Sequence, residues 1–217
     1  ACIAMPESYQ VPSAFVRTNG MATLNVLQAA QAVGVARLVH TSTSEVYGTA
    51  RHVPIDEQHP LQAQSPYAAS KIAADKLVES FGLSFGLPVV TVRPFNTFGP
   101  RQSARAIVPT IITQCLADTT VRVGNLTPTR DLNYVSDVVE GFVRAATSPH
   151  AVGRTINLGS GRETSVGELV KLIAELSEKP VELEQQDARM RPPHSEVERL
   201  VADLLAVARV REGKIEL

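Results

Sequence analysis

Tyr67 and Lys71 stand four residues apart and are the pair in this sequence best suited to proton transfer. On a helix, residues at this spacing share one face. A tyrosine hydroxyl, with a pKa of about 10, is a poor base at neutral pH, but the positive charge of a nearby lysine favours the tyrosinate. Tyr67 could then accept the proton of a sugar hydroxyl while a hydride leaves the adjacent carbon. The competing interpretation is a buried aromatic residue followed by a solvated lysine.

A second polar cluster, Thr41–Glu45, precedes this pair and follows a short apolar segment. Thr43 is suited to form a hydrogen bond at the oxygen that Tyr67 would deprotonate. Glu45 could act as a second base and remove the acidic proton beside a newly formed ketone; alternatively, it caps the turn that follows the strand. Ser44 can form hydrogen bonds but is no strong acid, which limits the eliminations that it could support.

The elements that must position these residues are predicted by an alternation of helical and extended patterns. They are a helix over 21–33 ended by Gly34, a strand over 37–42, a loop over 49–66, a helix over 66–85 and a strand over 89–93. Helices and strands that alternate with short links predict a parallel sheet covered on both faces. Ligands bind at the carboxyl ends of such strands. We therefore expect Thr41–Glu45 and Pro94–Asn96 to lie together.

The alternation becomes less regular after residue 100. The expected elements are helices over 106–117, 137–148 (opened by Ser136) and 166–178, strands over 121–123, 154–158 and 181–184, and a weakly helical tail beyond Val197. The third helix begins with a capping-box pattern at Ser165 and Glu168. The fold class is therefore α/β.

The composition is that of an ordinary globular protein. Its 217 residues include 21 basic and 22 acidic ones, a net charge of −1, so no global field would attract nucleic acid or an anionic membrane. Cys2 and Cys115 have neither metal-site spacing nor a disulfide framework, and the five histidines show no metal-ligand pattern. We expect a cytoplasmic protein without a membrane or nucleic-acid partner.

Arginines expected in loops form a further group of candidates, because a guanidinium group binds diphosphates in a bidentate manner. They are Arg93, Arg101, Arg105, Arg130, Arg189 and Arg191. Any one of them alone is better explained as a surface ion-pair partner, but several after the strand ends suggest that some meet an anionic substrate. The segment 157–161 contains two glycines but lacks the spacing of a phosphate loop, and we interpret it as a strand-to-helix turn.

Together these motifs resemble the extended short-chain dehydrogenase/reductase family, in particular its NAD-dependent nucleotide-sugar epimerases and dehydratases. The matching segments are 41–48, 65–71, 93–101, 129–131, 134–137 and 157–161. The resemblance implies a Rossmann-like parallel sheet that binds NAD and a smaller C-terminal α/β domain that binds a nucleotide-sugar. Residues 1–100 would form the second half of the NAD-binding domain, and 101–217 mainly the substrate domain, with about 126–160 returning to the Rossmann sheet.

The resemblance also implies roles for individual residues. The catalytic residues would be Thr43, Ser44, Glu45, Tyr67 and Lys71. The cofactor would be bound by Asn19, Thr41, Tyr67, Lys71 and Pro94. The substrate would be bound by Asn96, Arg101, Arg130 and Arg191, and no metal is expected.

The reaction within this family depends on the triplet Thr43-Ser44-Glu45. Glucose-type 4,6-dehydratases typically carry an aspartate in place of Ser44, whereas UDP-glucuronate decarboxylases carry the same triplet. The stretch 54–114 is more similar to 4,6-dehydratases that act on N-acetylglucosamine nucleotides, which favours dehydration with Glu45 as base. A 4-epimerase needs only Thr43, Tyr67 and Lys71, so epimerisation and decarboxylation stay open.

Family members begin with a strand, a glycine-rich turn and a helix that this sequence lacks, so we expect an N-terminally truncated chain. Such a chain would bind NAD poorly. A catalytically incompetent fragment or a nucleotide-sugar binding module is therefore the alternative to an enzyme. The resemblance further implies a homodimer formed through helices that include the one carrying Tyr67.

Overall fold

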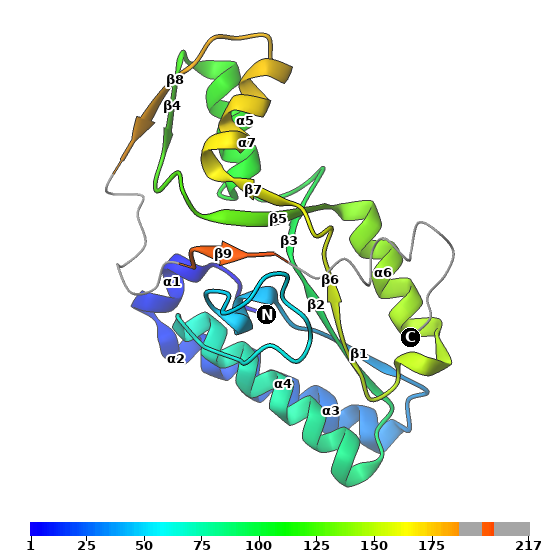
Figure 1. Ribbon diagram of the computed structural model, residues 1–217. Helices are drawn as coiled ribbons and strands as arrows, with labels where there is room; N and C mark the ends of the chain where they lie inside the picture. Colours follow the sequence, from blue (N-terminus) through cyan, green and yellow to red (C-terminus); the bar gives the residue numbers. More distant parts are fainter. Residues whose placement is uncertain (187–196, 202–217) are drawn as a thin grey trace.

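The computed structural model describes residues 1–186 and 197–201. A three-stranded parallel sheet of order β1-β2-β6 lies at its centre, formed by β1 (Leu38–Thr41), β2 (Val89–Pro94) and β6 (Thr155–Leu158). Helices α3 (Ala22–Val33) and α4 (Pro66–Phe85) cover one face, and α6 (Val135–Thr147) covers the other (Figure 1). The predicted parallel α/β fold of the Rossmann type is confirmed.

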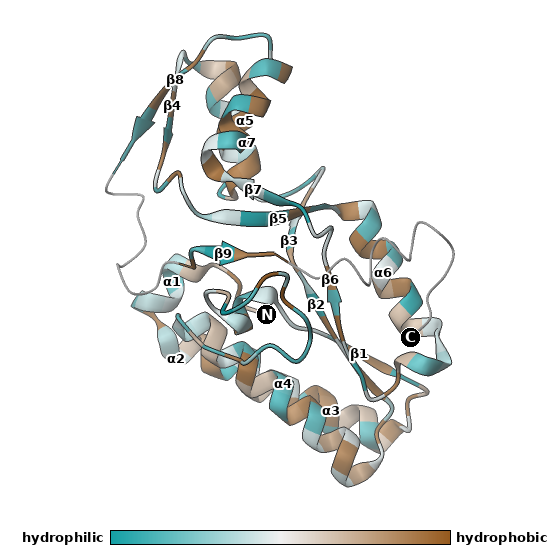
Figure 2. Ribbon diagram, viewed as in Figure 1, coloured by the Kyte–Doolittle hydropathy of each residue, from teal (hydrophilic) through white to brown (hydrophobic). Residues whose placement is uncertain are grey.

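Alternate residues of β2 fill the two cores on either side of this sheet. Val89 packs with the apolar face of α3 and α4, whereas Val90 and Val92 pack against α6. Figure 2 shows the brown, apolar segments of β1 and β2 at this centre. Because side chains of a strand alternate between faces, Thr91 and Arg93 point toward α4, where Arg93 meets a polar group of that helix.

Helix α4 has strong local signals at both ends. Pro66 occupies its first turn, where a missing N–H costs nothing, and the Ser65 hydroxyl accepts a hydrogen bond from the Ala68 amide. Gly86 ends the helix with a φ of 65°, a conformation that glycine adopts without strain. The predicted span 66–85 is therefore observed without change.

The N-terminal segment contains more helix than the sequence patterns predict. Here α1 (Met5–Gln10), α2 (Pro12–Phe15) and a π-helix, η1 (Val16–Met21), precede α3. The helix predicted from residue 21 thus begins one residue later as α-helix, because residue 21 still belongs to the π-turn.

A smaller unit lies beyond the sheet (Figure 1). It pairs β4 (Thr120–Val123) in parallel with β8 (Glu182–Gln185), and α5 (Ile107–Ala117) and α7 (Val166–Leu176) pack beside each other over this pair. Its buried core includes Ile111, Cys115 and Val121. The Ser165 side chain caps α7 in the predicted capping box with Glu168.

Short strands connect the two units, and the sequence patterns did not predict them. They are β3 (Asn96–Phe98), β5 (Thr129–Tyr134), β7 (Glu163–Ser165) and β9 (Arg199–Leu200). The prediction of a helical tail beyond Val197 is wrong for residues 199–200, which pair with β5 as a strand. Helix α6 begins at Val135 rather than after Ser136, and no side chain caps it. The residue boundaries of the two domains stay a prediction.

Two 3-10 turns complete the described structure, η2 (Ser44–Tyr47) and η3 (Pro149–Ala151). The first follows β1 directly and carries two of the predicted catalytic residues. Over the described residues, every helix is too short or too polar to cross a membrane.

Candidate active site

Tyr67 is buried at the start of α4 with its hydroxyl beside Thr43. Burial raises the pKa of Tyr67 above its ordinary value, and the hydrogen bond with the Thr43 side chain opposes this effect. The negative charges of Glu45 and Asp75 raise the pKa of Tyr67 further. The Phe15 ring meets the Tyr67 ring edge-on at a centroid distance of 6.2 Å, which fixes the aromatic ring from the other side. The predicted neighbours Thr43, Glu45 and Tyr67 therefore lie together.

Lys71 is buried one helical turn after Tyr67, and its ammonium donates a hydrogen bond of 2.6 Å to the Thr41 carbonyl. Burial lowers the pKa of Lys71, and the charge of Asp75 opposes this. The direct effect of Lys71 on Tyr67 stays a prediction, and the observed contact of the ammonium is with β1.

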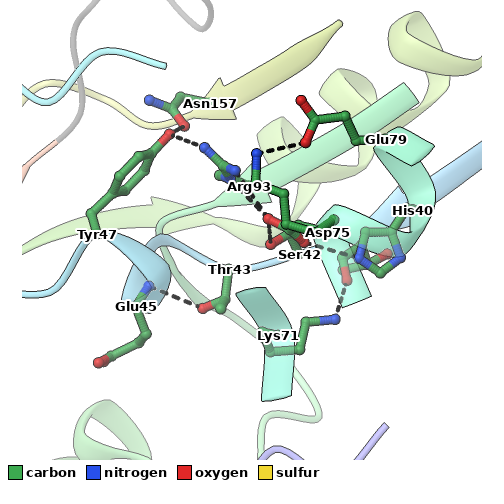
Figure 3. A network of polar contacts seen from close by, with 12 residues as sticks. His40, Ser42, Thr43, Glu45, Tyr47, Lys71, Asp75, Glu79, Arg93 and Asn157 are labelled. Carbon is green, nitrogen blue, oxygen red and sulfur yellow. Dashed lines mark hydrogen bonds and ion pairs between the residues drawn. The ribbon is translucent and has the colours of Figure 1, made fainter. Parts of the chain in front are cut away.

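The 3-10 turn η2 presents Glu45 to the site. Its start is capped by Thr43, whose hydroxyl accepts a hydrogen bond of 3.3 Å from the Glu45 amide. Ser44 is buried, whereas Glu45 is half-buried, and the Glu45 carboxylate points away from the Asp75 and Arg93 side chains (Figure 3). The capping role that was the alternative for Glu45 is thus filled by Thr43.

A buried carboxylate, Asp75, lies one further turn along α4 (Figure 3). It accepts hydrogen bonds from His40 (3.1 Å), from the Ser42 hydroxyl (2.8 Å) and from the Arg93 guanidinium (3.0 and 3.2 Å). Burial alone would raise the pKa of Asp75. The His40 hydrogen bond, the charge of Arg93 and the Ser42 hydrogen bond outweigh it and lower the pKa. Asp75 is therefore an ionised anchor between α4 and the strands.

Arg93 is a correction to the predicted set of loop arginines. It lies within β2, is 6% exposed and is paired with Asp75, so it is not placed to meet an anionic ligand. Its other end donates a hydrogen bond of 2.9 Å to the Tyr47 hydroxyl, which donates to Asn157 on β6. The guanidinium group thus ties β2 to η2 and β6 beneath the site.

The sequence pattern of the family described as GDP-mannose 4,6 dehydratase matches residues 1–210. This chain belongs to that family. The expected membership in the extended short-chain dehydrogenase/reductases that modify nucleotide-sugars is thereby confirmed.

Curated relatives of this dehydratase-family chain catalyse related reactions. A GDP-6-deoxy-D-mannose reductase of Pseudomonas aeruginosa is 32% identical over 196 residues, 86% of this chain and 64% of the relative. A dTDP-glucose 4,6-dehydratase of Streptomyces griseus is 40% identical over 164 residues, 75% of this chain and 50% of the relative. The chain therefore spans about half to two thirds of the length of these relatives.

Solved structures show the same fold. The NAD-dependent NDP-hexosamine 5,6-dehydratase TunA, involved in tunicamycin biosynthesis, superposes with a TM-score of 0.88 at 29% identity, covering 99% of this chain and 69% of that chain. The dTDP-glucose 4,6-dehydratase DesIV from Streptomyces venezuelae, solved with NAD bound, has a TM-score of 0.85 at 27% identity, covering 98% and 64%.

The residues that this dehydratase-family chain was expected to use for binding lie in different settings. Asn19 is buried, and its amide is engaged with both backbone groups of Cys2 and with the Ser70 hydroxyl, each at 2.9 Å. Asn96 begins β3, two residues after the end of β2, and its side-chain oxygen is buried without a hydrogen-bond partner among the described residues. Such an acceptor is suited to a ligand donor. Pro94 lies at the end of β2 as expected.

The remaining predicted arginines are nearer the surface. Arg101 is exposed with a φ of 69°, directly after Gly99-Pro100. Arg105 forms an ion pair of 3.0 Å with Glu7, and Arg130 is half-buried on β5. Arg189 and Arg191 lie outside the described residues. A contact of these side chains with substrate stays a prediction.

The segment 157–161 is a strand-to-strand turn, so its interpretation as a strand-to-helix turn is wrong. It leads from β6 to β7, and Asp131 on β5 holds it. The Asp131 carboxylate accepts hydrogen bonds from the amides of Ser160 (2.9 Å) and Gly161 (2.8 Å). Asn157, at the start of the same segment, donates a hydrogen bond from its side-chain amide to the Ile55 carbonyl and so holds the loop 49–66.

Sequence reasoning missed the carboxylate Asp75 and its partners His40 and Ser42. One signal was available: Asp75 follows Lys71 by four residues and Tyr67 by eight, so all three share a face of α4. A carboxylate on that face, among small apolar residues, needs partners once the helix packs on a sheet. Which strand would supply them follows only from the tertiary structure.

Proposed function

We propose that this chain carries the catalytic site of an NAD-dependent nucleotide-sugar 4,6-dehydratase, a lyase. The observation that carries the proposal is the convergence of Thr43, Tyr67 and Glu45. Thr43 forms a hydrogen bond with Tyr67, and the Glu45 charge acts on the same phenol. A hydroxyl acid–base group thus has a second base beside it, which a dehydration needs and a simple alcohol oxidation does not.

The residues at the end of β1 fit the nicotinamide part of NAD. The Thr41 carbonyl accepts one hydrogen bond from the buried Lys71 ammonium, which has three donors, so the ammonium is suited to ribose hydroxyls. Asn96, at the start of β3 just after the end of the neighbouring strand β2, supplies a buried acceptor. When bound, NAD supplies a reversible hydride acceptor. Lys71, Thr41, Asn19 and Pro94 are the residues that we assign to holding it.

The proposed chemistry follows from the protonation states that each group can reach. Tyr67, hydrogen-bonded to Thr43, removes the proton of the sugar 4-hydroxyl as the 4-ketone forms. The ketone makes the proton at carbon 5 acidic, and Glu45 removes it. Ser44 is buried and is no strong acid, so Glu45 also returns a proton to the oxygen that leaves carbon 6. Water is thereby eliminated across carbons 5 and 6. Return of the hydride to carbon 6 and of a proton to carbon 5 would then complete the 4-keto-6-deoxy sugar and leave NAD oxidised again.

Two other reactions use the same first step. A 4-epimerase, an isomerase, needs only Thr43, Tyr67 and Lys71, and similar proteins include a UDP-glucose 4-epimerase of Mycolicibacterium smegmatis that is 35% identical. A UDP-glucuronate decarboxylase carries the same Thr-Ser-Glu triplet. A non-catalytic nucleotide-sugar binding module or an incompetent fragment is the alternative of another class. The homodimer and the cytoplasmic location also belong to this proposal.

One assay separates these alternatives. The full natural protein is incubated with NAD and, in turn, with UDP-N-acetylglucosamine, its GDP counterpart, UDP-glucose and UDP-glucuronate, and the product masses are measured. Loss of water supports the dehydratase, loss of carbon dioxide the decarboxylase, and a change of sugar without change of mass the epimerase. Absence of turnover with all four supports the binding module.

Glu45→Gln is the variant that tests the second base. We expect dehydration to fall about 10²- to 10⁴-fold, the usual contribution of an acid–base group, while oxidation at carbon 4, followed as NADH absorbance in a single turnover, persists. Glu79→Gln is the matched control, since Glu79 forms an exposed pair with Lys76 on the far part of α4. Full dehydration by Glu45→Gln would contradict the role that we assign to Glu45.

A further inference from the structure

Asp75 is a buried charge that the proposed chemistry does not use. Its side chain is 4% exposed, and it belongs to the same face of α4 as Tyr67 and Lys71. Removing a carboxylate from water is unfavourable unless hydrogen bonds and an opposite charge compensate for it. A packed apolar residue could fill this place on α4 without that cost. Packing alone therefore does not explain why a carboxylate occupies this position.

The partners of Asp75 show what it holds. His40 and Ser42 flank Thr41, so their side chains leave the strand on the same side and both reach the Asp75 carboxylate. Between them, the Thr41 carbonyl accepts the Lys71 ammonium at 2.6 Å. One turn of α4, from Lys71 to Asp75, thus binds three consecutive residues of the β1 end.

Strand β2 is joined to α4 through Oδ2 of Asp75, the same oxygen that Ser42 binds. Arg93 donates from both Nε and Nη2 to Asp75 Oδ2, at 3.2 and 3.0 Å, and Ser42 donates to it as well. Hydrogen bonds are directional, so they fix how far α4 lies along the sheet, whereas apolar contacts such as those of Val78 with its neighbours tolerate sliding. A shift of α4 would move Tyr67 and Lys71 together.

We propose that Asp75 is a positioning residue that fixes α4 against the ends of β1 and β2, so that Lys71 stays on the Thr41 carbonyl and Tyr67 on the Thr43 hydroxyl. The inference rests on the proposed function, because turnover of a nucleotide-sugar reports on the placement of Tyr67 and Lys71. Asp75 itself touches neither substrate nor cofactor in this proposal.

A double-mutant cycle tests it. In the full natural protein, Asp75→Asn should lower kcat about 10²-fold, the effect of a small misplacement of catalytic groups, with little change in KM. In a Lys71→Met background, Asp75→Asn should cause a clearly smaller further loss, because one of the two contacts that it protects, that of Lys71 with the Thr41 carbonyl, is already gone. An equal fold-loss in both backgrounds would overturn the proposal and leave Asp75 a merely structural residue.

Ser42→Ala provides a second variant, because Asp75→Asn leaves Arg93 buried without its partner and can prevent folding. Ser42→Ala removes one hydrogen bond and no charge, and we expect a loss of kcat of about tenfold that is likewise smaller with Lys71→Met. Glu79→Gln, one turn beyond Asp75 and exposed, is the control and should leave kcat unchanged.

Hydrogen exchange gives a readout that needs no activity. Ser42→Ala should speed amide exchange in residues 38–43 and leave 155–158 on β6 unchanged. Unchanged exchange in 38–43, or the same increase in both strands, would overturn the proposal. If no nucleotide-sugar is turned over, the proposed function fails while this measurement still decides whether α4 is fixed to β1 locally. If the protein epimerises instead, the cycle is run on epimerisation.

Discussion

The two units of this molecule solve the problem of holding their helices in different ways. Beneath the site, buried polar groups join the sheet to α4 and to the turn η2; they include His40, Ser42, Asp75, Arg93 and Asn157. In the smaller unit, α5, α7, β4 and β8 enclose an apolar core around Ile111 and Val121, and charges such as those of Arg122 and Glu184 stay near the surface. The same chain thus contains a directional and a non-directional core.

The difference follows from what each unit must position. An apolar core is stabilised by the area that it buries, which constrains volume more strongly than direction. A buried hydrogen-bond network stabilises one arrangement and penalises its neighbours, because a displaced donor or acceptor stays unsatisfied. Groups that transfer protons must be placed within fractions of an ångström. The directional core lies under Tyr67 and Lys71, where this requirement holds.

The largest loss of stability is expected from a substitution that breaks the directional core. Arg93→Met leaves the Asp75 carboxylate buried without its cation, and breaking such a pair costs about 3–5 kcal/mol. The free energy of unfolding in urea measures the loss. Arg122→Met, in an exposed ion pair of the smaller unit, is the control and should change stability little. Similar losses for both variants would show that the two units are not built differently.

A somewhat smaller effect is expected from the apolar core. Ile111 is fully buried, so Ile111→Ala should cost about 2–5 kcal/mol, and Ile111→Val only about 0.5–1.5 kcal/mol. The graded response, measured by urea unfolding, would show that volume decides in this unit. In the network, by contrast, the nearly isosteric Asp75→Asn should be as damaging as a large truncation. If Asp75→Asn lowered the free energy of unfolding only slightly, the two cores would not differ in this way.

The smallest effect is a pH dependence that only the directional core should show. Because the pKa of Asp75 in the folded protein is lowered, its ionisation stabilises the fold above its ordinary pKa of 3.8. This stabilisation is lost as the pH falls below that value and through the lower pKa of the folded state. The free energy of unfolding, measured at a series of pH values from neutral to acidic, should therefore fall less steeply for Asp75→Asn than for the natural protein. Ile111→Val should keep the natural slope, and an unchanged slope in Asp75→Asn would contradict the assignment.

The sequence predicted those elements whose signals are local. Helix α4 has a proline in its first turn and a glycine after its end, and the apolar run of β2 identifies a buried strand. Strands β3 and β7 have three residues each and exist only because β5 lies beside them, so no short-range pattern could reveal them.

The candidate site was predicted in the same uneven manner. The grouping of Thr43, Glu45 and Tyr67 was expected from strand ends and helix spacing, and the structure brings these residues together. Arg93 was correctly predicted at the end of a strand, but its grouping with the anion-binding loop arginines was wrong. Its burial depends on Asp75, eighteen residues earlier on another element, which only the folded chain brings within 3.0 Å.

The π-helix η1 has a consequence for how this chain can vary. A π-turn accommodates one residue more than an α-turn, and here the two successive residues Asn19 and Gly20 are both buried, Asn19 bridging the Cys2 backbone and Ser70. Deleting a single residue here would restore a regular helix and rotate Phe15 relative to α3. We therefore expect the length of this segment to be conserved more strictly than the identity of its exposed residues.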